Sequence, residues 1–232
     1  MTTTSFDFAD LSGREQYRLL IGMVVPRPIA WVTSLDAAGG VNAAPFSFFN
    51  MLASEPPIVG LGIGRRPDGS PKDTARNIRE RGEFTVNIVS NVLVEAMTVT
   101  ATPFPPGISE LAEAGLTAAP GLRIATPRIQ EARAALECRL YQDLALPTGN
   151  SIFLGEVVAV HVDTCLLNGR GHVDPHGLDA VGRMGGDAYA TTRYLFDLAR
   201  IDLDNWQATH DPGTRRPHPA WAPRAEKNGK KG

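Results

Sequence analysis

Short runs of alternating hydrophobic and polar residues, most of them bounded by Gly, Pro or polar residues, recur along the chain between residues 26 and 163. Successive side chains of a strand point to opposite faces, so this two-residue period predicts half-buried strands. The predicted strands cover residues 29–35, 41–49, 58–63, 84–89, 134–141 and 151–163. Most connections are too short for the crossovers that parallel strands need. The pattern therefore predicts one six- or seven-stranded antiparallel barrel with a few peripheral helices.

A helical period appears in four places, at residues 13–22, 70–81, 91–98 and 109–114. The second of these has the clearest boundaries. Ser70 suits the N-cap, Pro71 the first helical position and Asp73 the first turn, while Gly82 ends the helix. We therefore expect the helix to start at Ser70.

The predicted strand at 58–63 carries glycine at alternate positions, and Gly60, Gly62 and Gly64 leave one of its faces without side chains. Strand glycines often mark a place where a ligand or another backbone comes close. Our interpretation is that the neighbouring strands form a shallow wall for a flat aromatic ligand. The loop and helix that follow would then hold the phosphate of that ligand.

Composition and charge narrow the class of protein. The chain is 43% hydrophobic and 21% charged, with a formal net charge of −2, which gives no overall field to recruit nucleic acid or an anionic membrane. The first residues lack the basic and apolar regions of a signal peptide, and the apolar stretch 19–25 is far shorter than the ~20 residues that span a bilayer. Cys138 and Cys165 are too few for a disulfide framework, so we expect two buried thiols in a cytoplasmic protein.

Several familiar motifs are absent from the sequence. Residues 64–69 have the first glycine spacing of a P-loop, but Ser70 and Pro71 stand where Lys and Ser or Thr are required. The pair His172 and His176 lies in a Gly- and Pro-containing loop without a clear third metal ligand. No Gly-x-Ser-x-Gly elbow occurs, so a hydrolase triad has no anchor.

A general phosphate site at the helix start is more plausible. A helix N-terminus offers free backbone N–H groups and a partial positive charge. Lys72 and Thr74 fall in the predicted first turn, and Arg65 and Arg66 come just before it. The alternative is a solvated helix with ordinary basic neighbours, and the residues alone leave both open.

Six segments, taken together in order and spacing, resemble the flavin reductase-like family of FMN-binding split-barrel proteins. They are 27–34 (RPIAWVTS), 42–50 (NAAPFSFFN), 72–77 (KDTARN), 84–89 (FTVNIV), 155–158 (GEVV) and 182–187 (GRMGGD). The resemblance covers residues 27–198 and implies a Greek-key split β-barrel, a homodimer and noncovalent FMN near the dimer interface. We therefore expect a flavin-binding domain at 1–203, and the Pro-rich, basic composition of 204–232 predicts a C-terminal tail.

The resemblance also implies the flavin-contacting residues. Those that would line the isoalloxazine ring and ribityl chain are Arg27, Pro28, Trp31, Val32, Thr33, Ser47, Phe48, Phe49 and Asn50. Those near the phosphate would be Arg65, Lys72, Asp73 and Thr74, with Asn77 in the same segment. Arg183 would close the site, in one arrangement from the second subunit.

The implied activity is reduction of FMN by NADH or NADPH, with reduced FMN passed to a partner monooxygenase. One departure matters, because several reductases of this group carry a histidine before the Gly-Glu-Val strand and this chain has Thr148, Gly149, Asn150 and Ser151 there. The departure favours an alternative, an FMN-holding electron-transfer protein that does not use NAD(P)H directly. A barrel that binds no flavin is a third possibility.

Overall fold

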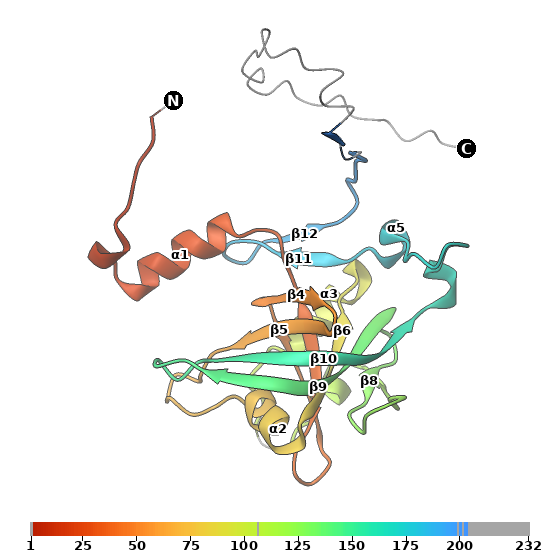
Figure 1. Cartoon of the computed structure of the whole chain (residues 1–232). Coiled ribbons are helices and arrows are strands. Elements are labelled where there is room, and N and C mark those ends of the chain that lie inside the picture. Colours follow the sequence, from red (N-terminus) through yellow and green to blue (C-terminus); the bar gives the residue numbers. More distant parts are fainter. Residues whose placement is uncertain (1, 106, 199, 201, 204–232) are drawn as a thin grey trace. The chain divides into compact units, whose positions relative to one another are not determined.

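The computed structural model describes residues 2–105, 107–198, 200, 202 and 203. The chain forms two compact units, residues 1–194 and 195–232. All the helices and strands named below belong to the first unit (Figure 1). The basic tail predicted for 204–232 lies outside the described residues.

The first unit is built on a seven-stranded antiparallel sheet. Its strands are β2 (Ala30–Leu35), β3 (Val41–Phe46), β4 (Phe49–Ser54), β5 (Pro57–Ile63), β6 (Glu83–Ile88), β9 (Ala134–Ala145) and β10 (Ser151–Val162). Their order in the sheet is β3-β2-β6-β9-β10-β5-β4, and every neighbouring pair is antiparallel. The prediction of a mainly β, antiparallel fold with six or seven strands is confirmed.

The two edge strands, β3 and β4, are consecutive in the chain. Only Ser47 and Phe48 separate them, so the sheet must curl until its edges approach each other. The Phe48 carbonyl accepts a hydrogen bond from the Gly62 N–H at 2.7 Å. The prediction of a single strand over 41–49 is wrong, because the chain bends at these two residues and begins β4, which the sequence pattern did not reveal.

The glycine face of β5 is occupied by the chain itself. A Cβ at Gly60 would lie 2.4 Å from Leu52 Cδ1, and a Cβ at Gly62 would lie 2.9 Å from Phe48 Cβ. These glycines therefore make room for β4 and the residue before it. The interpretation of this face as a wall for a flat ligand is corrected, and the alternative of a close backbone approach holds.

The sheet separates two hydrophobic cores, and β2 contributes to both. Ala30 and Val32 pack into one core with Phe84 and Phe153. Trp31 points the other way, into a second core. All three β2 side chains are fully buried, so the strand holds the sheet between two packed layers.

Short helices and small sheets complete the first unit. The helices are α1 (Gly13–Met23), α2 (Asp73–Arg81), α3 (Val94–Val99), α4 (Glu110–Glu113) and α5 (Pro175–Leu178), with 3-10 turns η1 (Phe8–Asp10), η2 (Asn91–Leu93) and η3 (Thr164–Leu166). The small sheets are β1 (Arg27–Pro28) with β11 (Val181–Arg183) and β12 (Tyr189–Thr191), and β7 (Ala118–Ala119) with β8 (Arg128–Ile129). The four predicted helical regions are confirmed.

Two of the expectations from the sequence concern membrane-spanning segments and the burial of the two cysteines. Within the described residues, no helix is long and apolar enough to cross a membrane. Both cysteines are free thiols. Cys138 is buried, and burial raises its pKa to about 12. The expectation of burial is wrong for Cys165, which is exposed beside the Arg133 guanidinium.

Candidate functional site

Helix α2 starts two residues later than its sequence suggests. Ser70 is not the cap, because its hydroxyl donates to Asp68 Oδ1 at 2.6 Å and its carbonyl accepts from the Arg66 N–H at 2.9 Å. These bonds hold Ser70 in a turn before the helix. Lys72 takes the N-cap position, and Gly82 ends the helix with φ of 69°, as predicted.

The N-terminus of α2 has no side-chain cap. Lys72 makes no capping hydrogen bond, and the first helical bond runs from the Arg76 N–H to the Lys72 carbonyl at 3.1 Å. The Lys72 ammonium instead lies 5.4 Å from the centre of the Phe46 ring. The first turn therefore offers backbone N–H groups, the positive end of a helix dipole and a nearby ammonium, which together suit an anion.

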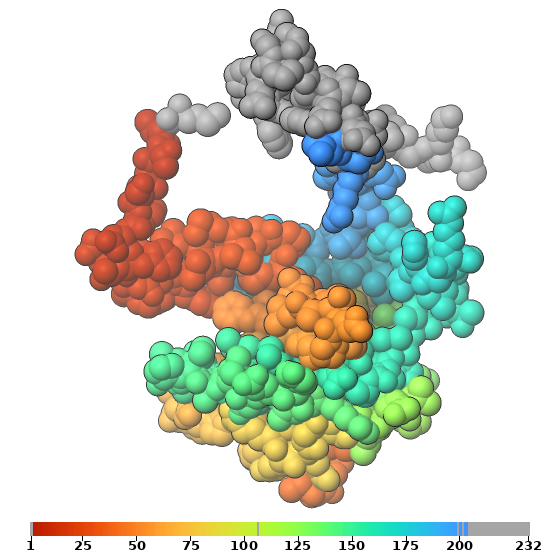
Figure 2. Space-filling model, viewed as in Figure 1, coloured from red at the N-terminus to blue at the C-terminus, as the bar shows by residue number. Residues whose placement is uncertain are grey.

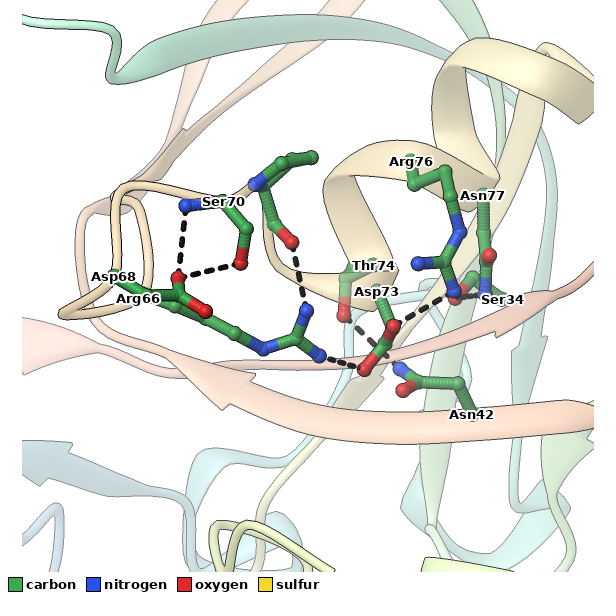
Figure 3. A network of polar contacts seen from close by, with 10 residues as sticks. Ser34, Asn42, Arg66, Asp68, Ser70, Asp73, Thr74, Arg76 and Asn77 are labelled. Atoms are coloured by element: carbon green, nitrogen blue, oxygen red, sulfur yellow. Dashed lines mark hydrogen bonds and ion pairs between the residues drawn. The ribbon is translucent and has the colours of Figure 1, made fainter. Parts of the chain in front are cut away.

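A buried polar network fixes the first turns of α2 against the sheet (Figure 3). Asn42 Nδ2, on β3, donates to Thr74 Oγ1 at 3.0 Å, and Asn77 Nδ2 donates to Ser34 Oγ, on β2, at 3.1 Å. Thr74 and Asn77 are each only 1% exposed. The network sets the direction of the helix N-terminus, while the buried Asn77 Oδ1 is left without a hydrogen-bond partner.

Two arginines meet the Asp73 carboxylate beside this network. Arg76 Nη2 lies 2.7 Å from Asp73 Oδ1, and Arg66 contacts the other carboxylate oxygen (Figure 3). Asp73 is therefore paired within the chain and orients two guanidinium groups. It does not cap its own helix.

A cavity of about 620 Å³ lies beside the same network. Its lining residues are Asp36, Gly40, Val41, Asn42, Arg66, Asp68, Asp73, Arg76, Asn77, Phe104, Pro105, Gly107, Ile108, Ser109 and Glu110. Burial, and then the nearby charge of Asp73, raise the pKa of Glu110. Hydrogen bonds from Ser70 lower the pKa of Asp68. The cavity thus brings acidic, basic and amide groups to one side of the α2 N-terminus.

The structure places Arg65 differently from Lys72 and Thr74. Arg65 Nε donates to the Gly149 carbonyl at 2.7 Å, and its Nη1 donates to the Gly69 carbonyl at 2.6 Å. These bonds tie the loop before α2 to the turn between β9 and β10. Arg65 therefore fixes two loops, and these donors are already used.

The predicted ring-lining residues of β2 have buried side chains. Trp31 Nε1 donates to Thr100 Oγ1 at 2.9 Å, and Thr33 Oγ1 donates to the Pro127 carbonyl at 2.5 Å. Val32 is fully buried in the core. A ligand at this strand could meet these three residues through their backbone atoms only.

The bend between β3 and β4 carries the next predicted group. Ser47 lies in this bend, and Phe48 is 53% exposed, with its ring edge-on to that of Tyr17 at 6.4 Å. Phe49 packs against the first core. Asn50 is exposed, and its Oδ1 accepts from the Met51 N–H at 2.9 Å. Of this group, Phe48 presents the largest open apolar surface.

Arg27, Pro28 and Arg183 come together in the small sheet, where Arg27 pairs with Arg183 and Pro28 with Gly182. Arg27 is 7% exposed and donates to three carbonyls, those of Ile21 (2.7 Å), Val24 (2.8 Å) and Met184 (3.0 Å). It therefore caps the C-terminal end of α1. Arg183 lies over the Tyr189 ring at 4.6 Å and donates to the Gly186 carbonyl.

The predicted residues thus form two groups. Lys72, Asp73, Thr74 and Asn77 gather at the α2 N-terminus, and a second group surrounds the end of α1 and the bend at Phe48. Strand β3 links them, because Asn42 contacts Thr74 at one end and the Ser47–Phe48 bend follows the other end. The predicted site did not include Ser34, Asn42 and Arg76, although all three lie within the segments that carry the family resemblance.

Within the part of the chain that the structure describes, no group of three or more His, Cys, Asp or Glu side chains is placed to hold a metal ion. The uncapped helix start and its ammonium instead suit a phosphate.

Comparison with known proteins identifies the family to which this chain belongs. The family model of the flavin reductase-like domain matches residues 22–176, and the chain belongs to this family. An uncharacterized protein of Deinococcus radiodurans is 44% identical over 214 residues, covering 89% of this chain and 94% of that protein.

Two solved structures extend the comparison. Nitrilotriacetate monooxygenase component B from Bacillus cereus is 34% identical with a TM-score of 0.81, covering 85% of this chain and 100% of that one. The 2-nitrobenzoate 2-nitroreductase NbaA of Pseudomonas fluorescens is also 34% identical, with a TM-score of 0.79 and coverage of 86% and 98%. The predicted family and split-barrel fold are confirmed.

Proposed function

We propose that this chain is an FMN-binding oxidoreductase that holds the flavin phosphate at the N-terminus of α2. The observation that carries the proposal is the uncapped first turn of α2, with Lys72 at the N-cap and Thr74 buried beneath it. An anion there would accept hydrogen bonds from the free backbone N–H groups and meet the Lys72 ammonium.

The chain's own residues bind and orient the flavin. Lys72 and the first-turn N–H groups hold the phosphate, and the bonds of Asn42 to Thr74 and of Asn77 to Ser34 keep that turn in place. The end of β3 and the bend at Ser47 and Phe48 would hold the ribityl chain and the ring. The bound flavin supplies the hydride and electron chemistry, while the protein supplies position and electrostatics.

NADH or NADPH is the proposed electron donor, and the reduced FMN goes to a monooxygenase partner. Support comes from the family and from the likeness to a monooxygenase component B. A homodimer is also proposed, because β4 is an edge strand with exposed Met51 and Leu52, which a second copy could cover.

Anaerobic mixing tests the activity. The FMN-loaded protein is mixed with NADH or NADPH in a stopped-flow instrument, and the flavin absorbance is followed. We expect bleaching with at least one of the two donors. Unchanged absorbance with both would reject the reductase proposal.

A flavin-holding electron carrier is the second candidate, and the turn before β10 favours it. That turn has no histidine, and its Asn150 and Gly149 are bonded to Arg65. This candidate predicts an FMN-loaded protein that dithionite or a protein donor reduces quickly, while NADH and NADPH leave it oxidised.

A further inference from the structure

A second cavity, of about 390 Å³, lies between α1 and Phe48. Its lining residues are Gly13, Gln16, Tyr17, Leu20, Ile21, Val24, Arg27 and Phe48. None of the residues of α1 is buried, and Figure 2 shows this helix, in red, projecting from the rest of the first unit. The cavity is therefore accessible, and its volume falls within the ~300–1,000 Å³ of typical small-ligand pockets.

The cavity walls are apolar and aromatic. The rings of Tyr17 and Phe48 meet at 65° with centroids 6.4 Å apart, and Leu20 and Val24 extend the apolar surface. Gln16 adds no free amide donor, because its Nε2 donates to the carbonyls of Phe8 and Leu11. A planar ring suits these walls, since aromatic side chains favour edge-to-face or offset contacts.

One buried positive charge sits at the wall of this cavity. Arg27 is 7% exposed, and the structure gives it no ion pair with a carboxylate among the described residues. Its three acceptors are backbone carbonyls, and its buried Nε has no acceptor. The two carbonyls at the end of α1 carry only a partial negative charge. A buried cation without a counter-ion is costly, so an anion beside it would be stabilised.

We propose that this cavity binds a small aromatic carboxylate. The ring lies among Tyr17, Leu20 and Phe48, and the carboxylate faces the Arg27 guanidinium. This ligand combines the two features that the cavity offers, an apolar aromatic wall and one uncompensated cation. The cavity shares Arg27 and Phe48 with the residues expected near the flavin ring, whereas none of the phosphate-site residues lines it, so competition with FMN tests whether the two sites are separate.

Calorimetric titration of the full chain with benzoate tests the proposal. Benzyl alcohol serves as the uncharged ligand with the same ring. We expect benzoate to bind about tenfold more tightly than benzyl alcohol, because only benzoate forms a charge-assisted contact. Equal affinities, or no binding of benzoate, would overturn the proposal.

Variants locate the site without removing Arg27, which also holds the end of α1. We expect Phe48→Ala to weaken benzoate binding about fivefold. Val92→Ala is the matched control, because Val92 is 80% exposed and does not line the cavity. Equal benzoate affinity in Phe48→Ala and wild type would contradict this location.

Two further measurements test whether the flavin ring or a second copy of the chain occupies the cavity instead. Benzoate binding that persists with saturating FMN supports a separate site, and loss of benzoate binding on FMN addition would make the flavin ring the occupant. Sedimentation at the same protein concentrations measures the mass of the complex. Benzoate binding that is the same for monomer and dimer supports the proposal. Benzoate binding that is lost when the dimer forms would make a second copy of the chain the occupant.

Discussion

Two regions of this protein bring backbone N–H groups together, and they differ in whether the chain places a negative charge among them. In the segment before β8, the N–H groups of Leu122, Arg123 and Ile124 all donate to the buried Glu137 carboxylate. His161 Nε2 lies 2.5 Å from the same carboxylate. At the start of α2 the first-turn N–H groups have no capping side chain, and the N-cap residue is the cation Lys72.

The difference separates a structural site from the proposed binding site. Burial alone would raise the pKa of Glu137, but hydrogen bonds from His161 and from the Leu122 and Arg123 N–H groups outweigh it and lower the pKa. The chain thus supplies its own anion there and completes the site. At α2 it supplies the donors and the cation without an anion of its own, and we propose that a ligand provides that anion.

Removing the internal anion has the largest expected effect. Glu137→Ala removes a fully buried carboxylate and leaves three backbone N–H groups without their acceptor, among them that of the buried Ile124. We expect a loss of about 3 kcal/mol in the free energy of unfolding, measured by urea denaturation. Glu113→Ala, at an exposed position on α4, should change stability by less than about 0.5 kcal/mol. Equal unfolding midpoints for the two variants would contradict this account of Glu137.

Giving α2 its own anion would make the two regions alike. In Lys72→Asp, the new carboxylate caps the first turn and repels a phosphate. We expect FMN affinity to fall about 100-fold or more, while the free energy of unfolding rises by about 1 kcal/mol. Lys72→Ala removes the ammonium without adding an acceptor, so FMN affinity should fall only about 10-fold. FMN dissociation constants equal to that of the wild type would reject the phosphate assignment.

Acid should weaken the completed site. The folded-state pKa of Glu137 is below its ordinary value of 4.5, so its contribution is fully present above that pH. The contribution is lost as pH falls through the lower folded-state pKa. Urea unfolding between pH 6 and pH 3 measures it, and the wild type should lose more stability than Glu137→Gln across this interval. Parallel pH profiles would show that another group controls the acid transition.

His161 should have the smallest effect of the set. It is one of four groups that meet Glu137, and its side chain is 26% exposed, so water can partly replace it. We expect His161→Ala to lower the free energy of unfolding by about 1 kcal/mol. A loss as large as that of Glu137→Ala would mean that the His161 contact, and not the backbone N–H groups, holds the carboxylate.

The sequence predicted the strands and helices well where a local pattern determines them. It missed β4, because the pattern over 41–49 predicts one continuous strand through Phe48. In the structure the chain bends at Phe48, which packs against Gly62. It misplaced the start of α2, because Ser70 bonds to Asp68 and Arg66 in a turn instead of to its own helix.

The candidate site could be predicted only in part. The motif around Lys72 lies within one short segment, so a sequence can show it. The Glu137 site joins residues 13 to 24 positions apart, across β9, β10 and a loop, and no local pattern marks such a contact. Arg27 lies in a segment that resembles the flavin-binding residues of the family, but only the structure shows that its guanidinium caps α1.

A comparison of FMN with riboflavin tests the central claim most directly. The two molecules share the ring and the ribityl chain, and only FMN carries the phosphate. Calorimetric titration of the full chain should give FMN an affinity at least about tenfold higher than that of riboflavin, because only FMN meets Lys72 and the open first turn of α2. Equal affinities for FMN and riboflavin would contradict the account.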